Sequence, residues 1–270
     1  MPGRPVCVCG RHKTMGTVRE SIRNIQTVRR WWRRAGRARS RLLGKPDAWV
    51  DLPALCRRIR PAAVLDLGAH VGRITERFAD ELSDVPIHAF EPTPHSAAAL
   101  RQRVARLRNV TVHEIALADR SGVLPLFLNR FDATNSLLEN AHGPGSPQDE
   151  LYEHVGRIEV CVTTLDDWCT AQLPTGDLVI KADLQGCEGR MLAGACRVLR
   201  DGRVAALYSE VLFAPMYEGQ ASFWDLHETL TTRHGLALWQ IYPLHRDPIG
   251  RVIWSDALWL REDVLALMRR

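Results

Sequence analysis

From residue 62 onward, short apolar runs alternate with segments in which apolar residues recur every three or four positions. The runs predict strands at 63–67, 86–91, 110–116, 122–128, 158–163, 178–183, 204–210, 236–242 and 252–260. Helices are predicted at 73–82, 92–107, 187–199 and 222–233, and a short helix is predicted to begin at 165. Repeated β-α units with short connections predict an α/β fold, a doubly wound and mostly parallel sheet with helices on both faces.

The first 45 residues differ from the rest in pattern and in charge. They hold 13 Lys and Arg and one acidic residue, whereas the remaining residues hold 23 basic and 30 acidic residues. The net charge of +5 therefore combines a basic arm with a mildly acidic domain. Residues 1–14 have no periodicity and are expected to be disordered, and a helix is predicted over 15–41. We divide the chain into a basic N-terminal arm, 1–45, and one domain, 46–270.

The predicted arm helix carries one apolar stripe, formed by residues three and four apart: Val18, Ile22, Ile25, Val28 and Trp32. The simplest interpretation is that this stripe packs on the domain. Arginines together with tryptophans also favour an anionic membrane surface. A nucleic-acid-binding arm is a third alternative, although the acidic domain does not favour a nucleic acid partner. A further hypothesis is that Met15 is the true start of the chain.

Composition narrows the class of protein. Apolar residues make up 46% of the chain and charged residues 25%, which is ordinary for a globular protein in water. No apolar run approaches the roughly 18 residues that a membrane span needs, and no signal peptide is visible. We expect a cytoplasmic protein, with peripheral membrane association as the alternative. The seven scattered cysteines indicate reduced thiols, and no metal is expected because Cys7, Cys9 and His12 lack a fourth ligand.

The main chemical signal is a glycine loop, Asp66-Leu67-Gly68-Ala69-His70-Val71-Gly72, between a predicted buried strand and a helix. A turn at the carboxyl end of a parallel strand lines a ligand crevice. Gly68 and Gly72 allow the backbone to turn tightly and to approach a ligand. Glu91 ends the next predicted strand, where a carboxylate can accept hydrogen bonds from both hydroxyls of a ribose. The pattern therefore predicts a ligand that contains adenosine.

NAD is the natural rival ligand, but its fingerprint needs three glycines, and this loop has Ala69 and His70 in that stretch. Asp66 also places a negative charge beside the turn, which is unfavourable near a pyrophosphate and favourable near an ammonium group. S-adenosylmethionine carries an ammonium group and a sulfonium and has no phosphate, so it is the predicted cofactor. A glycine turn without a ligand is the alternative.

Six motifs, in this order, resemble the FkbM family of methyltransferases. They are the 66–72 loop, Phe90-Glu91-Pro92, Asn109-Val110-Thr111-Val112, Ala116-Leu117 with Asp119 and Gly122, Val162-Thr163-Thr164-Leu165-Asp166, and Lys181-x-Asp183-x-Gln185-Gly186-x-Glu188. The resemblance covers roughly residues 60–212. It implies a Rossmann-like class I methyltransferase fold with a seven-stranded sheet and S-adenosyl-L-methionine as cofactor. It also implies O-methylation of a sugar, glycolipid or other natural product.

The candidate cofactor-binding residues lie in the glycine loop and at the ends of later strands: Asp66, Gly68, His70, Gly72, Glu91, Ala116, Leu117 and Asp183. Ala116 and Leu117 are expected to hold the adenine ring between apolar side chains. His70 stands where members of the family often carry Asn. The Gly-, Pro- and Asn-rich stretch 129–157 is expected to cover the acceptor as a lid, with a disordered loop as the alternative.

A hydroxyl acceptor needs a base that takes its proton. Asp183 is the first candidate because it ends a predicted central strand among polar residues, and an ion pair with Lys181 is predicted on the same side of that strand. Glu210 is the second candidate for the catalytic base, and Glu188 and His70 follow. Alternatively, Asp183 orients the acceptor while water takes the proton.

The sequence therefore predicts an enzyme, an S-adenosylmethionine-dependent O-methyltransferase for a small-molecule or glycan acceptor. An N-methyltransferase of nucleic acid or protein is the alternative. Enzymes that methylate base amino groups generally carry an Asn/Asp-Pro-Pro-aromatic turn, where this chain has Asp183-Leu184-Gln185-Gly186. A nicotinamide-dependent oxidoreductase and a non-catalytic binding module are further alternatives. The acceptor and the oligomeric state are not indicated by any of these patterns.

Overall fold

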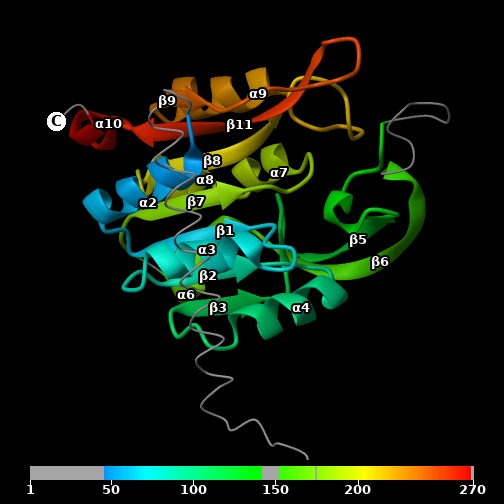
Figure 1. Ribbon diagram of the computed structural model, residues 1–270, viewed down its shortest axis with the longest axis horizontal. Coiled ribbons are helices and arrows are strands. Elements are labelled where there is room, and N and C mark those ends of the chain that lie inside the picture. The colour runs from blue at the N-terminus through cyan, green and yellow to red at the C-terminus, as the bar shows by residue number, and fades with distance from the viewer. Residues whose placement is uncertain (1–45, 142–151, 174, 269–270) are drawn as a thin grey trace, which may run out of the picture. The chain divides into compact units, whose positions relative to one another are not determined.

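The structure, a computed structural model, describes residues 46–141, 152–173 and 175–268 (Figure 1). The chain divides into two units, Met1–Asp47 and Ala48–Arg270. The predicted arm, with its helix over 15–41 and the cysteines at 7 and 9, lies outside the described residues. Among the described residues, no helix is both long enough and apolar enough to cross a membrane.

A mostly parallel sheet forms the centre of the unit Ala48–Arg270. Its strands follow the order β10-β11-β8-β7-β1-β2-β3, and β9 pairs with β11. The bounds are β1 Ala63–Leu67, β2 Ile87–Phe90, β3 Val110–His113, β7 Leu178–Ala182, β8 Val204–Leu212, β9 Leu236–Ile241, β10 His245–Arg246 and β11 Val252–Arg261. The five neighbouring strands β3, β2, β1, β7 and β8 are parallel to one another, and β11 runs antiparallel to its neighbours β8, β9 and β10. The predicted fold class is confirmed, with the two-residue β10 as an addition.

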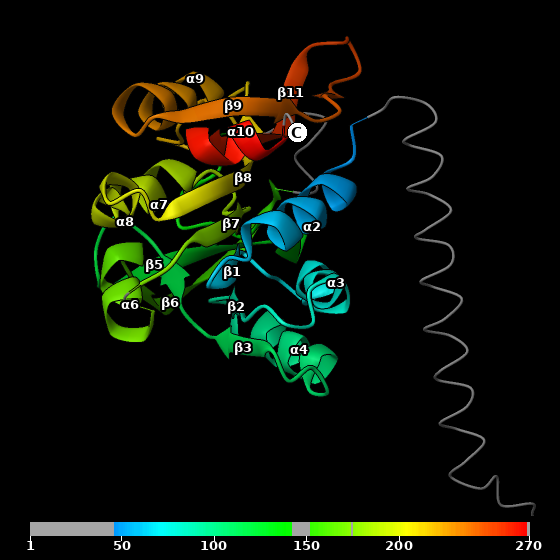
Figure 2. The ribbon, with the colours of Figure 1, turned by 90° about the vertical axis from the view of Figure 1, so that its left-hand side faces the viewer.

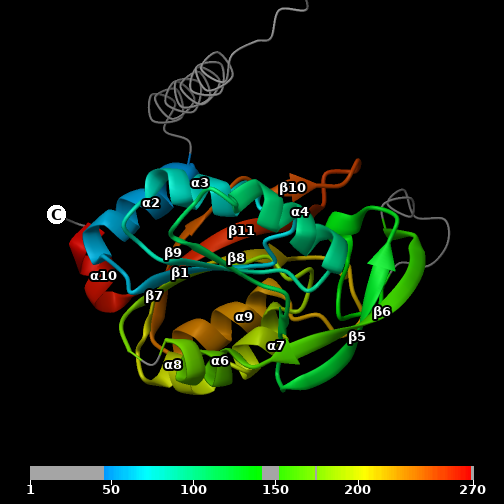
Figure 3. The same ribbon diagram turned by 90° about the horizontal axis from the view of Figure 1, so that it is seen from below.

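Helices cover both faces of this sheet (Figures 2 and 3). On one face lie α2 (Ala48–Ile59), α3 (Arg73–Glu81) and α4 (Pro94–Val104), and on the other lie α6 (Leu165–Gln172), α7 (Glu188–Ala193), α8 (Cys196–Arg200) and α9 (Phe223–Glu228). Successive side chains of a strand point to opposite faces, so Val64 packs with the α2 and α3 side while Leu65 packs with the other. The central strands β1 and β7 are therefore buried along their whole length.

A second, three-stranded sheet contains β4 (Ala116–Leu117), β5 (Gly122–Asn129) and β6 (His154–Thr163), in the order β4-β6-β5. In Figure 1, β5 and β6 lie beside one end of the parallel strands. The sequence predicted a single strand over 110–116, but β3 ends at His113 and Ala116 joins this second sheet. β6 begins at His154, before the start predicted at residue 158. Residues 154–157 have no strand pattern of their own and belong to the strand because they pair with β5.

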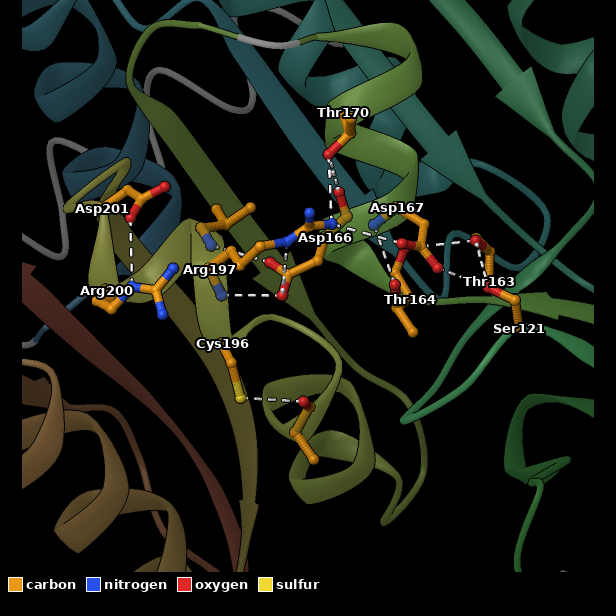
Figure 4. Close-up of polar contacts among 12 residues, drawn as sticks. Ser121, Thr163, Thr164, Asp166, Asp167, Thr170, Cys196, Arg197, Arg200 and Asp201 are labelled. Atoms are coloured by element: carbon orange, nitrogen blue, oxygen red, sulfur yellow. Dashed lines mark hydrogen bonds and ion pairs between the residues drawn. The ribbon is translucent and has the colours of Figure 1, made fainter.

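The helix predicted over 187–199 is broken into α7 and α8. Asp166 accepts hydrogen bonds from the backbone N–H groups of Arg197 (2.8 Å) and Val198 (2.9 Å), at the start of α8 (Figure 4). Gly194 lies at the break, where a Cβ would come within 2.1 Å of the backbone oxygen of Ala118. The motif that contains Asp166 therefore holds α8 in place. Two helices, α2 and α10 (Glu262–Met268), were not predicted from the sequence.

Candidate active site

A cavity of about 270 Å³ opens at the carboxyl ends of β1, β2 and β7. It is lined by residues from six parts of the chain: 67–71 with 73–74 around the end of β1, 90–93 around the end of β2, 115–117 around β4, Leu126 of β5, 132–133 with 135–137 of the predicted lid, and residues between 181 and 187 around the end of β7. In doubly wound sheets, this edge is where ligands bind. The predicted site residues that line the cavity are Gly68, His70, Glu91, Ala116, Leu117 and Asp183.

The two glycines of the loop are both required by its geometry. Gly68 has φ +75°, and a Cβ there would lie 1.9 Å from the backbone oxygen of Asp183. Gly72 has φ +78°, and its Cβ would lie 2.4 Å from Leu100 Cδ1. Gly72 does not line the cavity. It contributes by letting α3 start close to α4, whereas Gly68 lets the loop lie against the end of β7.

Asp66 is fully buried and does not line the cavity. The Thr75 hydroxyl donates to its Oδ2 (2.6 Å), and Lys181 Nζ lies 3.2 Å from its Oδ1. Lys181 also donates to the backbone oxygen of Gly68 (2.9 Å) and lies 3.8 Å from Asp183 Oδ2. Burial on its own would lower the pKa of Lys181, but the charges of Asp66 and Asp183 outweigh it and raise that pKa. Lys181 therefore ties the glycine loop to the end of β7.

Glu91 connects the glycine loop with the segment after β2. Its Oε2 accepts from the backbone N–H of His70 and its Oε1 from that of Thr93, both at 2.8 Å. A carboxylate has about four lone-pair sites, so the two oxygens keep capacity for further hydrogen bonds. Glu91 lines the cavity although only 6% of it is exposed. The backbone thus holds this carboxylate in one orientation at the cavity wall.

Apolar side chains form a second part of the cavity lining, here called the apolar wall. It is made by Phe90, Ile115, Ala116, Leu117 and Leu126. The Phe90 ring stacks on His113 and meets Trp168 edge-on, at centroid distances of 4.7 and 5.0 Å. Burial, together with the neighbouring His88, lowers the pKa of His113 to about 4, so this ring is neutral near pH 7. Behind Phe90, the apolar wall is therefore supported by two uncharged aromatic side chains, His113 and Trp168, which the sequence pattern did not indicate.

His70 has φ +47°, a left-handed backbone conformation that few non-glycine residues adopt. Its Nε2 lies 3.1 Å from Asp132 Oδ2, so the glycine loop contacts the predicted lid. The same lid segment is fixed at Ser136, whose hydroxyl donates to the backbone oxygen of Gln185 (2.7 Å). Within the 129–157 stretch, residues 132–133 and 135–137 therefore form part of the cavity wall, and residues 142–151 lie outside the described residues.

The three carboxyls among the candidate bases are placed differently. Asp183 lines the cavity, and its side chain is 42% exposed. Glu210 does not line it and is linked to Asp183 through Gln185, whose Nε2 donates to both carboxylates. Glu188 is buried behind the loop, accepts from the backbone N–H of Leu184 (2.6 Å), and has its pKa raised to about 7 by burial. Gln185 stands within one of the family motifs, but no pattern in the sequence singled it out as a site residue.

Comparisons with known proteins identify the family. A family model described as the methyltransferase FkbM domain matches residues 66–236. The 2-O-methyltransferase NoeI of Sinorhizobium fredii is 31% identical over 163 residues, which cover 58% of this chain and 66% of NoeI. The 31-O-demethyl-FK506 methyltransferase FkbM of Streptomyces tacrolimicus is 29% identical over 160 residues, which cover 50% of this chain and 60% of that protein. The chain thus spans just under two thirds of NoeI and three fifths of the FkbM protein.

Among solved structures, a precorrin-6y C5,15-methyltransferase from Geobacter metallireducens superposes with a TM-score of 0.39 and 12% identity. The match covers 78% of this chain and 88% of that one.

Proposed function

Because the chain belongs to the FkbM family of methyltransferases, we propose that it is an O-methyltransferase that uses S-adenosyl-L-methionine and acts on a hydroxyl of a sugar, glycolipid or other natural product. The single observation that carries this proposal is the cavity in which Gly68, Glu91 and Asp183 meet. Two relatives that are named O-methyltransferases, one of them a 2-O-methyltransferase, support the choice of an oxygen acceptor.

The residues around the cavity fit this cofactor. Glu91 is held by two backbone N–H groups and keeps acceptor capacity for ribose hydroxyls. Ala116 and Leu117 offer an apolar surface for adenine, and the loop at Gly68 exposes backbone that no Cβ covers. Asp66 is occupied by Lys181, so we assign it to holding the loop. When bound, the cofactor supplies a methyl group on a positively charged sulfur.

In this proposal, Asp183 receives the proton of the acceptor hydroxyl, and Glu91 and the glycine loop would hold the cofactor that supplies the methyl group to the acceptor oxygen. Two candidate bases, Asp183 and His70, line the cavity and are partly exposed, which an acceptor requires. The Nε2 of His70 lies 3.1 Å from Asp132, so we assign the role to Asp183. Glu210 and Glu188 lie behind it and do not line the cavity. The main task of the protein is to align acceptor and methyl group, and the segment 132–137 is placed to limit the approach of water.

Calorimetry tests the cofactor assignment. We expect S-adenosylhomocysteine to bind and NAD not to bind, because the loop lacks the middle glycine that a pyrophosphate needs. Glu91→Ala should weaken S-adenosylhomocysteine binding about tenfold or more, since two polar hydroxyls lose a charged partner. Glu76→Ala, in the helix that follows the loop, is the matched control and should bind normally. NAD binding without S-adenosylhomocysteine binding would overturn the proposal.

Asp183→Asn tests the base. The amide oxygen of Asn can still accept the hydrogen bond from Gln185, so the local structure and S-adenosylhomocysteine affinity should be retained. Methyl transfer should fall about 100-fold or more, because Asn cannot take the proton. A deletion strain complemented with wild-type or variant protein, compared by untargeted metabolite analysis, gives a readout for any acceptor. A methylated product restored to wild-type level by Asp183→Asn would remove Asp183 from the mechanism.

A further inference from the structure

Gln185 is held at every polar atom that its side chain offers. Nε2 donates to Asp183 Oδ1 at 2.7 Å and to Glu210 Oε2 at 3.2 Å. Oε1 accepts from the hydroxyl of Tyr217 at 2.7 Å. With the amide nitrogen facing the two carboxyls and the amide oxygen facing Tyr217, every polar atom of the side chain has a partner. These three contacts hold the side chain in one orientation.

The backbone of Gln185 is also fixed. Its φ is +53°, in the left-handed region that disfavours residues with a Cβ. The backbone oxygen accepts from the Ser136 hydroxyl at 2.7 Å. Such a conformation persists only where the surroundings hold it, and here the lid segment and Tyr217 do so. Gln185 itself lines the cavity, so this rigid amide lies beside the place where an acceptor would bind.

The two acids that share the amide have different surroundings. Asp183 is partly exposed and lies 3.8 Å from Lys181 Nζ. The pKa of Glu210 is raised well above its usual range, first by burial and then by Asp183, Glu188 and Asp256, while Lys181 opposes the rise. Burial raises the pKa of the phenols Tyr152 and Tyr217, and the charge of Glu210 adds to the rise. Asp183 and Glu210 both lie within hydrogen-bond distance of the same Nε2 atom, so without this donor the two carboxyls would compete for one proton.

We propose that Gln185 is a positioning residue for methyl transfer: its amide bridges Asp183 and Glu210, orients Asp183 at the cavity wall, and keeps Asp183 from sharing a proton with Glu210. The catalytic part of this statement rests on the proposed function, whereas the hydrogen-bonding part does not. Gln185 forms no covalent bond and transfers no proton. It acts through Asp183, which stays available to the acceptor hydroxyl.

The test is a pH titration of the side-chain carboxyl carbons by ¹³C NMR, using protein labelled at Asp and Glu. Gln185→Met keeps the size of the side chain and removes both donors. We expect the midpoint of Glu210, assigned with Glu210→Gln, to rise by about one pH unit or more, because its ionised form loses a donor and faces Asp183 directly. Gln240→Met is the matched control, since its amide donates to the backbone oxygen of Ile241 and contacts no carboxylate. In Gln240→Met, the Glu210 midpoint should equal that of the wild type.

Gln185→Glu is the second variant, for use if the Met variant does not fold. A third carboxyl in the cluster should raise the Glu210 midpoint further than Met does, because like charges disfavour ionisation. An unchanged Glu210 midpoint in both Gln185 variants, or an equal shift in Gln240→Met, would overturn the proposal. S-adenosylhomocysteine affinity is measured in parallel. If the wild-type protein does not bind S-adenosylhomocysteine, the proposed function is contradicted, and the titration result for Gln185 still stands.

Discussion

Gly68 is the residue at which the glycine loop and the end of β7 come into direct contact. A methyl group there would have to occupy the space of the Asp183 backbone oxygen, 1.9 Å away, and φ +75° adds strain. We predict that Gly68→Ala lowers the free energy of unfolding by about 3–5 kcal/mol, which is in the range of severe backbone clashes. Urea unfolding monitored by tryptophan fluorescence measures this.

Gly219 provides the matched control for that prediction. It has φ +71°, and a Cβ there would meet no atom within 4 Å. Gly219→Ala should therefore cost only the strain of the left-handed backbone, about 1 kcal/mol. Equal losses in the two variants would show that the contact with Asp183 is not what requires Gly68.

How far single site residues could be predicted depended on how local their geometry is. Glu91 was predicted because its place at the end of a strand, after a glycine loop, is a local pattern. Gln185 was not, because its function depends on Glu210 and Tyr217, which are far away in sequence. The same reason applies to Asp132, whose contact with His70 joins two segments that no periodicity relates.

At the scale of elements, the strands were predicted well because buried parallel strands have apolar runs that differ clearly from their surroundings. The break between α7 and α8 could not be predicted in this way. It depends on Asp166, some 30 residues earlier, capping the start of α8, and on close packing at Gly194. The start of β6 likewise depends on pairing with β5 and not on its own residues.

The segment 132–137, part of the predicted lid, allows a prediction at the scale of elements. His70 and Asp132 join the glycine loop to the segment 132–137, and removal of this contact should let the segment open more often. A partly exposed pair contributes at most about 1 kcal/mol, so Asp132→Ala should speed dissociation of S-adenosylhomocysteine by about two- to fivefold. Stopped-flow fluorescence measures the rate. Asp84→Ala, in an exposed turn before β2, is the control. A dissociation rate equal to that of the wild type would show that this contact does not hold the cavity closed.

At the scale of the whole molecule, the division of charge seen in the sequence continues into the core. The domain is mildly acidic, and three carboxyls, the buried Glu188 and the half-buried Glu210 and Asp256, lie close enough to Asp183 for its charge to disfavour their ionisation. Burial is nevertheless the main cause that raises the pKa of Glu188 to about 7, that of Asp256 to about 6, and that of Glu210 well above its usual range. The folded protein is therefore most stable when some of these carboxyls hold protons.

This arrangement predicts an unusual dependence of stability on pH. Glu188 binds its proton more tightly in the folded state, with a pKa of about 7 against 4.5. Below pH 4.5, Glu188 holds its proton in both the folded and the unfolded protein and does not lower the free energy of unfolding. As the pH rises from 4.5 through 7, the free energy of unfolding falls, because only the unfolded protein releases this proton readily. Glu188→Gln keeps an oxygen that can accept from the backbone N–H of Leu184 and removes the charge. At pH 8 we expect this variant to exceed the wild type by up to about 3 kcal/mol in the free energy of unfolding, and at pH 4.5 by much less. Urea unfolding at both pH values measures the difference. Glu114→Gln, which loses an exposed pair with Arg101, should gain nothing at pH 8. A Glu188→Gln variant that is no more stable than the wild type at pH 8 would show that the buried Glu188 is stabilised in its charged form.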